Sequence, residues 1–114
     1  MVKKRFVPRA TEIVMIDFSP TRGREQAQLR PAIVLSGQGY NDRANLLVCV
    51  PCTRTVRGYP FEVRIASLPE PGVALADQLR TLDWRECGTH SIGLATDAEM
   101  AELRAKLKAL LGMT

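Results

Sequence analysis

Aromatic residues are scarce in this chain, at 5% of the sequence with a single Trp. The core therefore has to be built from Val, Ile, Leu and Ala, which suits a compact β-rich body. His90 is the only histidine, so a catalytic pair of histidines cannot be assembled within one chain. We expect His90 to lie at the surface, near a turn at Gly88.

Cysteine is also scarce, and long apolar runs are missing. Three cysteines cannot form a closed set of disulfides, and no stretch resembles a signal peptide or a membrane span. Cys49 and Cys52 have the spacing of half a zinc site, but no second pair of ligands follows, and residues 46–52 are typical of a buried strand. We expect structural cysteines in a cytoplasmic protein with no membrane association.

The chain has 114 residues, of which 46% are hydrophobic, so it can bury one core and we expect a single domain over residues 1–114. An excess of 16 Lys and Arg over 12 Asp and Glu gives a net charge of +4. This excess favours a polyanionic partner, with nucleic acid the first candidate, although the same charge also serves solubility alone.

Short apolar runs rich in β-branched residues predict most of the strands. They cover residues 13–18, 32–36 and 46–50, and residues 61–66 alternate in the two-residue period of a half-buried strand. One or two further strands are expected within residues 73–79 and 81–84. A body of five to seven short strands is expected to curl into a small barrel.

A C-terminal helix is expected to close this barrel. Thr96 and Glu99 have the spacing of a capping box, and Gly112 is a suitable stop. Between them, one stripe at helical spacing holds Met100, Leu103, Leu107, Leu110 and Leu111. The expected fold class is mainly β (α+β).

The connection between the first two expected strands, residues 19–30, is long for so small a domain and carries Arg22, Arg24 and Arg30. Long loops held by a rigid sheet are often functional. Arg30 directly precedes Pro31, which biases its backbone towards an extended conformation at the mouth of the second strand. Its guanidinium can therefore be held in place.

Cleavage of RNA without a metal needs a group that takes the 2′-hydroxyl proton and a cation that offsets charge on the phosphorus oxygens. A guanidinium suits the second role, because its planar fork of donors matches two phosphate oxygens. Arg30 is the candidate cation and Glu25 a candidate proton acceptor. The alternative is that Glu25 and Arg30 only pair with each other across the loop.

Two more polar segments are candidates for contacts with a phosphate backbone or with bases. Residues 53–58 hold hydroxyls and arginines in what is otherwise an ordinary β-turn region: Thr53, Arg54, Thr55 and Arg57. Asp77 and Gln78 lie inside an apparently apolar strand, where buried polar groups need partners. They either bond a neighbouring loop or face a groove and contact base edges.

No cluster of His, Asp or Glu resembles a metal site, and no phosphate-binding loop, nucleophile elbow or dinucleotide fingerprint is present. We therefore expect no metal and no cofactor. Any catalysis has to rest on arginine, carboxylate and hydroxyl groups.

Several segments in one order and spacing together carry a family resemblance. They are residues 17–23 (Asp-Phe-Ser-Pro-Thr-Arg-Gly), Glu25-Gln26 with Arg30-Pro31-Ala32, residues 50–53 (Val-Pro-Cys-Thr), residues 58–63 (Gly-Tyr-Pro-Phe-Glu-Val), and residues 72–78 (Gly-Val-Ala-Leu-Ala-Asp-Gln) before Trp84-Arg85. With these segments, nearly the full chain resembles the MazF/PemK family of bacterial mRNA interferase toxins, in its chromosomal MazF branch.

The resemblance implies a homodimer of SH3-like barrels that cuts single-stranded RNA at short sequences and leaves a cyclic phosphate and a 5′-hydroxyl. It also implies an antitoxin partner whose acidic tail occupies the RNA groove. The catalytic positions of the family correspond to Arg30, Thr53 and Glu25. The expected RNA-binding residues are Phe18, Pro20, Arg24, Gln26, Arg54, Thr55, Arg57, Asp77 and Gln78.

A plasmid-borne branch of the family uses another catalytic scheme. Its residues are the aspartate of the Asp-Gln pair, an arginine two positions before that aspartate, and a histidine in the first loop. Here the positions of this arginine and this histidine hold Leu75 and Arg24. That scheme does not carry over, and Asp77 is placed in substrate binding.

Two other functions fit the same barrel. A toxin that grips DNA gyrase uses a Trp-Gly-Ile tail in this fold, whereas this chain ends Leu110-Leu111-Gly112-Met113-Thr114. A barrel that binds nucleic acid without cutting it would not need Arg30 and Thr53 together at strand ends. The sequence therefore favours the ribonuclease.

Overall fold

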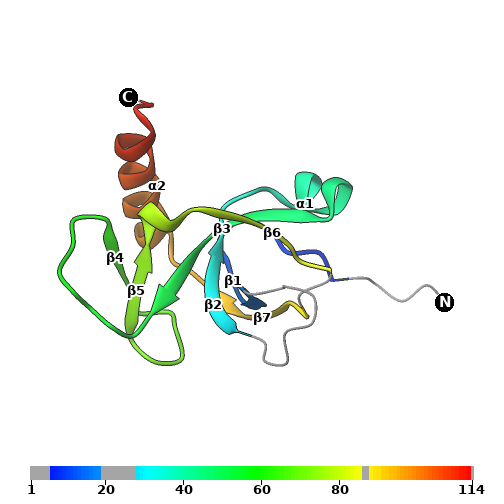
Figure 1. Cartoon of the computed structure of the whole chain (residues 1–114), viewed down its shortest axis with the longest axis horizontal. Coiled ribbons are helices and arrows are strands. Elements are labelled where there is room, and N and C mark those ends of the chain that lie inside the picture. Colours follow the sequence, from blue (N-terminus) through cyan, green and yellow to red (C-terminus); the bar gives the residue numbers. More distant parts are fainter. Residues whose placement is uncertain (1–5, 19–27, 86–87, 114) are drawn as a thin grey trace.

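The computed structural model describes residues 6–18, 28–85 and 88–113. These residues form a strongly curled antiparallel sheet with a helix near each end (Figure 1). Its strands are β1 (Glu12–Asp17), β2 (Leu29–Val34), β3 (Leu46–Thr53), β4 (Glu62–Ile65), β5 (Gly72–Leu75), β6 (Arg80–Asp83) and β7 (His90–Leu94). The helices are α1 (Gln38–Ala44), the short 3₁₀ helix η1 (Ala76–Gln78) and α2 (Asp97–Leu111). The expected fold class is confirmed, with the barrel in a partly open form.

The sheet is organised around β3, its longest strand. The strand order is β4-β5-β3-β2-β1-β7, and β6 also pairs with β3. Residues 46–49 of β3 pair with β6, whereas Cys52 and Thr53 pair with β5. The chain changes from β5 to β6 through η1, so one edge of β3 is covered by two strands in succession. This change of partner gives the sheet its curl and brings the end of β3 beside η1.

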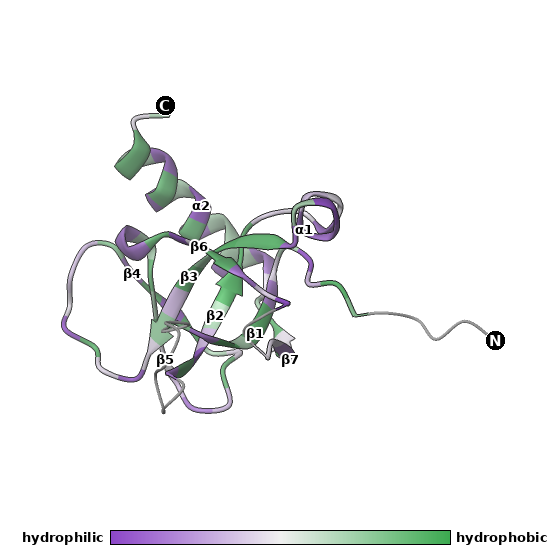
Figure 2. Ribbon diagram, turned by 45° about the vertical axis from the view of Figure 1, so that its right-hand side comes forward, coloured by the Kyte–Doolittle hydropathy of each residue, from purple (hydrophilic) through white to green (hydrophobic). Residues whose placement is uncertain are grey.

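Hydrophobic side chains fill both faces of the curled sheet. One cluster packs under α2 and contains Ile13, Ile33, Val50, Ile65 and Leu103 among others. The second cluster lies on the other face and contains Val14, Ile16, Val34, Leu47 and Trp84 among others. Figure 2 shows the hydrophobic colour concentrated on the central strands. Alternate residues of β1 and β2 therefore serve different cores, which is why both strands are apolar almost throughout.

The expected capping box at the start of α2 is confirmed, and its Glu99 also forms hydrogen bonds outside the helix. Thr96 Oγ1 accepts a hydrogen bond from the Glu99 backbone N–H at 3.1 Å, and Glu99 Oε1 accepts one from the Thr96 N–H at 2.9 Å. The same carboxylate also accepts from the Ala66 N–H at 2.7 Å and from the Ser67 hydroxyl at 2.7 Å. Glu99 therefore joins the helix start to the turn after β4.

The apolar stripe expected on α2 is confirmed as a buried face for its first three residues. Met100, Leu103 and Leu107 are buried, but Leu110 and Leu111 are 39% and 53% exposed. The helix ends at Gly112, whose φ of 70° is in the left-handed region that glycine tolerates. The last turn extends past the sheet, so its leucines have no core to enter in this chain.

Two elements were not predicted, and one expected strand is shorter than predicted. The sequence did not predict α1 or β7, and the strand expected over residues 73–79 stops at Leu75. Asp77 and Gln78 lie in η1 and are exposed, not buried in a strand. Their polar side chains therefore need no internal partners and are available at the surface.

No helix in the described part of the chain is both long and apolar enough to cross a membrane. Cys49 and Cys52 are buried and form no disulfide with each other, as expected, and His90 is exposed.

Candidate active site

Arg30 and Thr53 lie on neighbouring strands at the same end of the sheet. Ala32 of β2 pairs with Pro51 of β3 in antiparallel register. Because antiparallel pairing steps backwards along one strand as it steps forwards along the other, Arg30 and Thr53 are each two residues beyond this pair, at the same end of the two strands. The same two residues line both of the cavities described below. Residues 23 positions apart in the sequence are thus brought into one place.

Arg30 is held by the sheet more firmly than its sequence position suggested. It was expected at the mouth of the second strand, but β2 begins at Leu29, so Arg30 lies within it and pairs with Ile16 of β1. Its side chain is exposed, and within the described residues it forms no ion pair. A fixed backbone and a guanidinium with no ion-pair partner among the described residues suit a phosphate-binding group.

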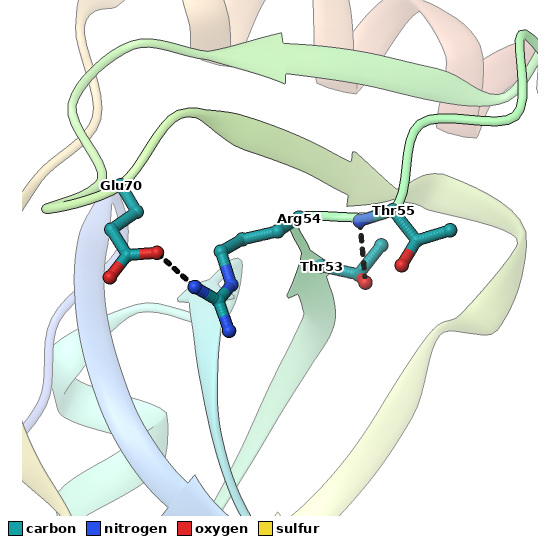
Figure 3. A network of polar contacts seen from close by, with 4 residues as sticks. All are labelled: Thr53, Arg54, Thr55 and Glu70. Carbon is teal, nitrogen blue, oxygen red and sulfur yellow. Dashed lines mark hydrogen bonds and ion pairs between the residues drawn. The ribbon is translucent and has the colours of Figure 1, made fainter.

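Thr53 ends β3, and its side chain has a fixed orientation. Its Oγ1 accepts a hydrogen bond from the Thr55 backbone N–H at 3.1 Å (Figure 3). This contact uses a lone pair of the hydroxyl and leaves the O–H free to donate. The hydroxyl can therefore donate to an oxygen of a bound phosphate.

Gly72 gives Thr53 its position through close backbone contact. An added Cβ on Gly72 would lie 2.4 Å from the Thr53 carbonyl oxygen and 3.1 Å from its carbonyl carbon. No side chain fits there, so only glycine lets β5 approach β3 this closely at Thr53. Gly72 is a positioning residue that the sequence analysis did not single out.

One cavity of about 370 Å³ lies on the side of Arg30 and Thr53 that faces η1, and we call it the polar cavity. It is lined by Arg30, Thr53, Thr55, Arg57, Tyr59, Phe61, Glu62, Leu75, Asp77 and Gln78. The structure therefore brings four expected RNA-binding residues, Thr55, Arg57, Asp77 and Gln78, next to the two candidate catalytic residues. Tyr59 and Glu62 were not expected.

Glu62 holds the loop that forms one wall of the polar cavity. Its carboxylate accepts hydrogen bonds from the Arg57 N–H at 3.0 Å and from the Gly58 N–H at 2.9 Å. Lys106 of α2 donates to the Glu62 carbonyl oxygen at 2.7 Å. The segment Gly58-Tyr-Pro-Phe-Glu62 contributed only to the family resemblance, and nothing in its pattern indicated this loop-capping role.

A second cavity of about 350 Å³ lies on the other side of Arg30 and Thr53, and we call it the apolar cavity. Besides these two residues it is lined by Met15, Pro31, Cys52, Arg54, Leu68, Pro69, Glu70 and Ile92. Arg54, expected to bind RNA, is ion-paired with Glu70 and both side chains are largely exposed (Figure 3). Its charge is therefore partly offset before any ligand arrives.

Burial raises the pKa of the Cys52 thiol to about 12, with Cys49 and Glu99 adding to the effect. Cys52 is thus a neutral, protonated wall of the apolar cavity. It is unsuited to act as a nucleophile, because the thiolate is the reactive form.

Phe18, an expected RNA-binding residue, is almost entirely buried. Its side chain is only 7% exposed and belongs to the second core cluster. The Arg80 guanidinium lies 5.5 Å from the Phe18 ring centroid and donates to the Phe18 carbonyl oxygen at 3.1 Å. A ring this buried cannot serve as an open stacking surface, so the exposed group at this position is Arg80.

Four expected site residues, Pro20, Arg24, Glu25 and Gln26, lie outside the described residues. The alternative pairing of Glu25 with Arg30 lies outside them for the same reason. Among residues 6–18, 28–85 and 88–113, no three His, Cys, Asp or Glu side chains come close enough together to hold a metal ion.

The sequence and the fold of the chain match known proteins. Residues 9–111 match the family of PemK-like, MazF-like toxins of type II toxin-antitoxin systems. The chain belongs to this family of toxins. Within it, the chain is an endoribonuclease of the MazF type, as the comparisons with individual proteins show.

The endoribonuclease toxin MazF of Escherichia coli K12 is 43% identical over 108 residues, which are 95% of this chain and 97% of that protein. Endoribonuclease PemK of Escherichia coli is 26% identical over 97% of this chain and 87% of its own. The higher identity to MazF agrees with the absence of the plasmid-branch residues at Leu75 and Arg24.

Solved structures of MazF proteins have the same fold as this chain. The crystal structure of MazF from Deinococcus radiodurans superposes with a TM-score of 0.85 at 44% identity, covering 96% of this chain and all of that one. A MazE-MazF structure from the same organism gives a TM-score of 0.84 at 40% identity, with the same coverage. The relatives are endoribonucleases, so the gyrase-binding alternative is not supported.

Proposed function

We propose that this toxin cuts single-stranded mRNA at short sequences without a metal ion, with Arg30 and Thr53 acting on one phosphate. The observation that carries the proposal is that these two residues, just beyond the last printed pair of β2 and β3, both line each of the two cavities. A phosphate bound there has one cavity on either side, and the flanking nucleotides can enter them.

The reaction is a transfer within the RNA backbone. The 2′-oxygen bonds to phosphorus, the bond from phosphorus to the 5′-oxygen breaks, and the products are a cyclic phosphate and a 5′-hydroxyl. The Arg30 guanidinium offsets the charge that builds on the non-bridging oxygens, and the Thr53 hydroxyl donates to one of them. Glu25 is the proposed acceptor of the 2′-hydroxyl proton.

The polar cavity receives the RNA on one side of this phosphate. Arg57 and Thr55 are placed to meet the backbone, while Asp77 and Gln78 offer an acceptor and an amide to base edges. Pro20, Arg24, Gln26 and Arg54 complete the proposed binding set, and Arg80 takes the place given to the Phe18 ring.

The experiment is cleavage of a long single-stranded RNA in EDTA, with the end groups of the fragments identified. We expect 5′-hydroxyl ends, and 3′ ends that resist phosphomonoesterase until the cyclic phosphate is opened by acid. A strict requirement for added metal, or fragments with 5′-phosphates, contradicts the proposed reaction.

A homodimer in the cytoplasm and an acidic antitoxin partner complete the proposal. Structures of MazE-MazF from Deinococcus radiodurans, at 39% to 41% identity, supply the precedent for an antitoxin complex. The net charge of +4 and the exposed arginines beside the cavities suit an acidic peptide that competes with RNA. Co-expression with an acidic protein encoded immediately upstream should abolish cleavage.

A further inference from the structure

Arg54 and Glu70 form an ion pair beside the proposed catalytic residues, and the proposed function uses only the arginine. We propose that Glu70 is a built-in competitor of the RNA: it holds Arg54 in the free protein, and an RNA phosphate has to displace it. Glu70 thereby lowers the affinity of the site for RNA and sets how tightly the toxin holds its substrate. This inference rests on the proposed function, because it assumes that Arg54 binds an RNA phosphate.

The end of β3 fixes the backbone on the Arg54 side of the pair. Arg54 directly follows Thr53, and the Thr55 N–H donates to Thr53 Oγ1 at 3.1 Å, which closes a tight turn around Arg54 (Figure 3). An added Cβ on Gly72 would lie 3.4 Å from Arg54 Cα, so the start of β5 also packs against this turn. The Arg54 side chain therefore begins at a fixed position next to Thr53.

Two prolines restrict the backbone on the Glu70 side. Glu70 lies between Pro69 and Pro71, two residues before Gly72. Each proline ring fixes its own φ, and Pro71 also disfavours the helical region for Glu70, so this turn has few conformations. Because Gly72 packs against the end of β3, the turn carries the Glu70 carboxylate to Arg54. The fold itself thus brings the two charges together.

The pair is open to water, so its partners exchange easily. The side chains of Arg54 and Glu70 are 74% and 63% exposed. An exposed ion pair contributes little to stability, because water and salt screen the attraction. A phosphate offers the guanidinium two oxygens in a geometry that matches its fork of donors. RNA that is already bound at Arg30 can therefore take Arg54 from Glu70.

Among the arginines that line the two cavities in the described part of the chain, only Arg54 is held by a carboxylate. Arg30 and Arg57 form no ion pair within residues 6–18, 28–85 and 88–113. Glu70 therefore acts on one selected cation of the site. The simpler alternative is that Glu70 repels RNA through space without acting through Arg54, and the test separates the two.

The test measures the affinity of Glu70→Gln for RNA by fluorescence anisotropy. The probe is a short single-stranded RNA with a mapped cleavage site and a 2′-deoxyribose at the scissile nucleotide, so that it binds without being cut. We expect Glu70→Gln to bind it about two- to fivefold more tightly than the wild type, the range that loss of one exposed pair allows. The slope of log Kd against log salt concentration should steepen by up to about 0.7, the value for one phosphate contact on a single strand.

A double-mutant cycle with Arg54→Gln shows whether Glu70 acts through Arg54. We expect Glu70→Gln to give no gain in affinity when Arg54 is replaced. Asp42→Asn is the matched control, because Asp42 forms another exposed pair, with Arg85 at 3.6 Å, and lines neither cavity. It removes the same single negative charge at the other end of β3, next to α1, and should leave RNA binding unchanged.

Two results overturn the proposal. One is that Glu70→Gln binds the RNA no more tightly than the wild type, which is also what a merely structural role for Glu70 predicts. The other is an equal gain in the Arg54→Gln background or from Asp42→Asn, which would make the gain a general effect of charge. Either result leaves the dependence of cleavage on Arg30 intact, whereas loss of that dependence, or cutting of the 2′-deoxy probe, would instead refute the proposed function.

Discussion

The backbone of Gly72 touches the backbone of Thr53 so closely that an added Cβ would lie 2.4 Å from the Thr53 carbonyl oxygen. These residues belong to β5 and β3, and Thr53 pairs with the next residue of β5, Val73. The close contact leaves no room for a side chain at position 72 beside the end of β3. The backbone position of Thr53, the proposed catalytic threonine, is therefore matched to a glycine 19 residues away.

Gly72→Ala should therefore displace Thr53. We expect kcat to fall by about tenfold or more, because misplacement of a reacting group by about 1 Å can cost 10²-fold. Overpacking should also lower the free energy of unfolding by about 1–3 kcal/mol. Gly93→Ala is the control, since its added Cβ would meet only Ser67 O at an ordinary 3.7 Å. Equal kcat values for the two variants, both folded at the assay temperature, would show that Gly72 does not position Thr53.

Glu62→Gln should loosen the wall of the polar cavity. The carboxylate bonds two consecutive backbone N–H groups, at Arg57 and Gly58, and an amide accepts less strongly than a charged carboxylate. We expect KM for RNA to rise several-fold with a smaller change in kcat, measured under steady-state conditions. A larger fall in kcat than rise in KM would assign Glu62 a part in the reaction itself.

Glu99 should make the fold sensitive to acid. Desolvation opposes ionisation of its carboxyl, but hydrogen bonds from Thr96, Ser67 and Ala66 outweigh it and lower the pKa below the ordinary 4.5. A pKa that is lower in the folded chain gives stability that is fully present above pH 4.5 and is lost as the pH falls through the folded value. Denaturant unfolding between pH 7 and 3 measures this loss.

We expect Glu99→Gln to be less stable than the wild type at pH 7, with the gap narrowing below pH 4.5. Glu102→Gln on the same helix is the control, because Glu102 forms only an exposed pair with Lys106. A constant gap between the wild type and Glu99→Gln across this range would contradict the assigned role.

Cys52 should be inert although it lines a cavity. Its raised pKa of about 12 keeps the thiol protonated at neutral pH. In a Cys87→Ser background, iodoacetamide at pH 8 should modify the protein in denaturant but not in the native state, as read by mass spectrometry. Rapid native labelling of Cys52 would mean that the cavity wall is open and the thiol is reactive.

The sequence predicted the parts of the fold that local chemistry determines. β-branched runs identified β1 and most of β3, and the Thr96–Glu99 capping box located the start of α2. The seven residues of α1 and the short, half-exposed β7 lack a clear periodic signal, so tertiary contacts determine them. β3 also continues to Thr53, beyond the apolar run over residues 46–50 that identified it.

The site was predictable in its residues but not in its arrangement. Loop position and guanidinium chemistry singled out Arg30, whereas a catalytic role for Thr53 came only from the family resemblance. Their alignment depends on the β2–β3 register, which is set by long-range pairing. Gly72 and Glu62 contact backbone groups of distant residues, which no local sequence pattern predicts. Asp77 and Gln78 are exposed because η1 interrupts the expected strand.

The most direct test of Arg30 is single-turnover cleavage of RNA in EDTA by Arg30→Ala. Arg64→Ala is the control, because Arg64 is exposed on β4 and lines neither cavity. We predict that Arg30→Ala binds RNA moderately less tightly but cuts it about a hundredfold or more slowly, while Arg64→Ala cuts at near wild-type speed. A folded Arg30→Ala protein that cuts at near wild-type speed would make Arg30 only a binding residue and would contradict the account.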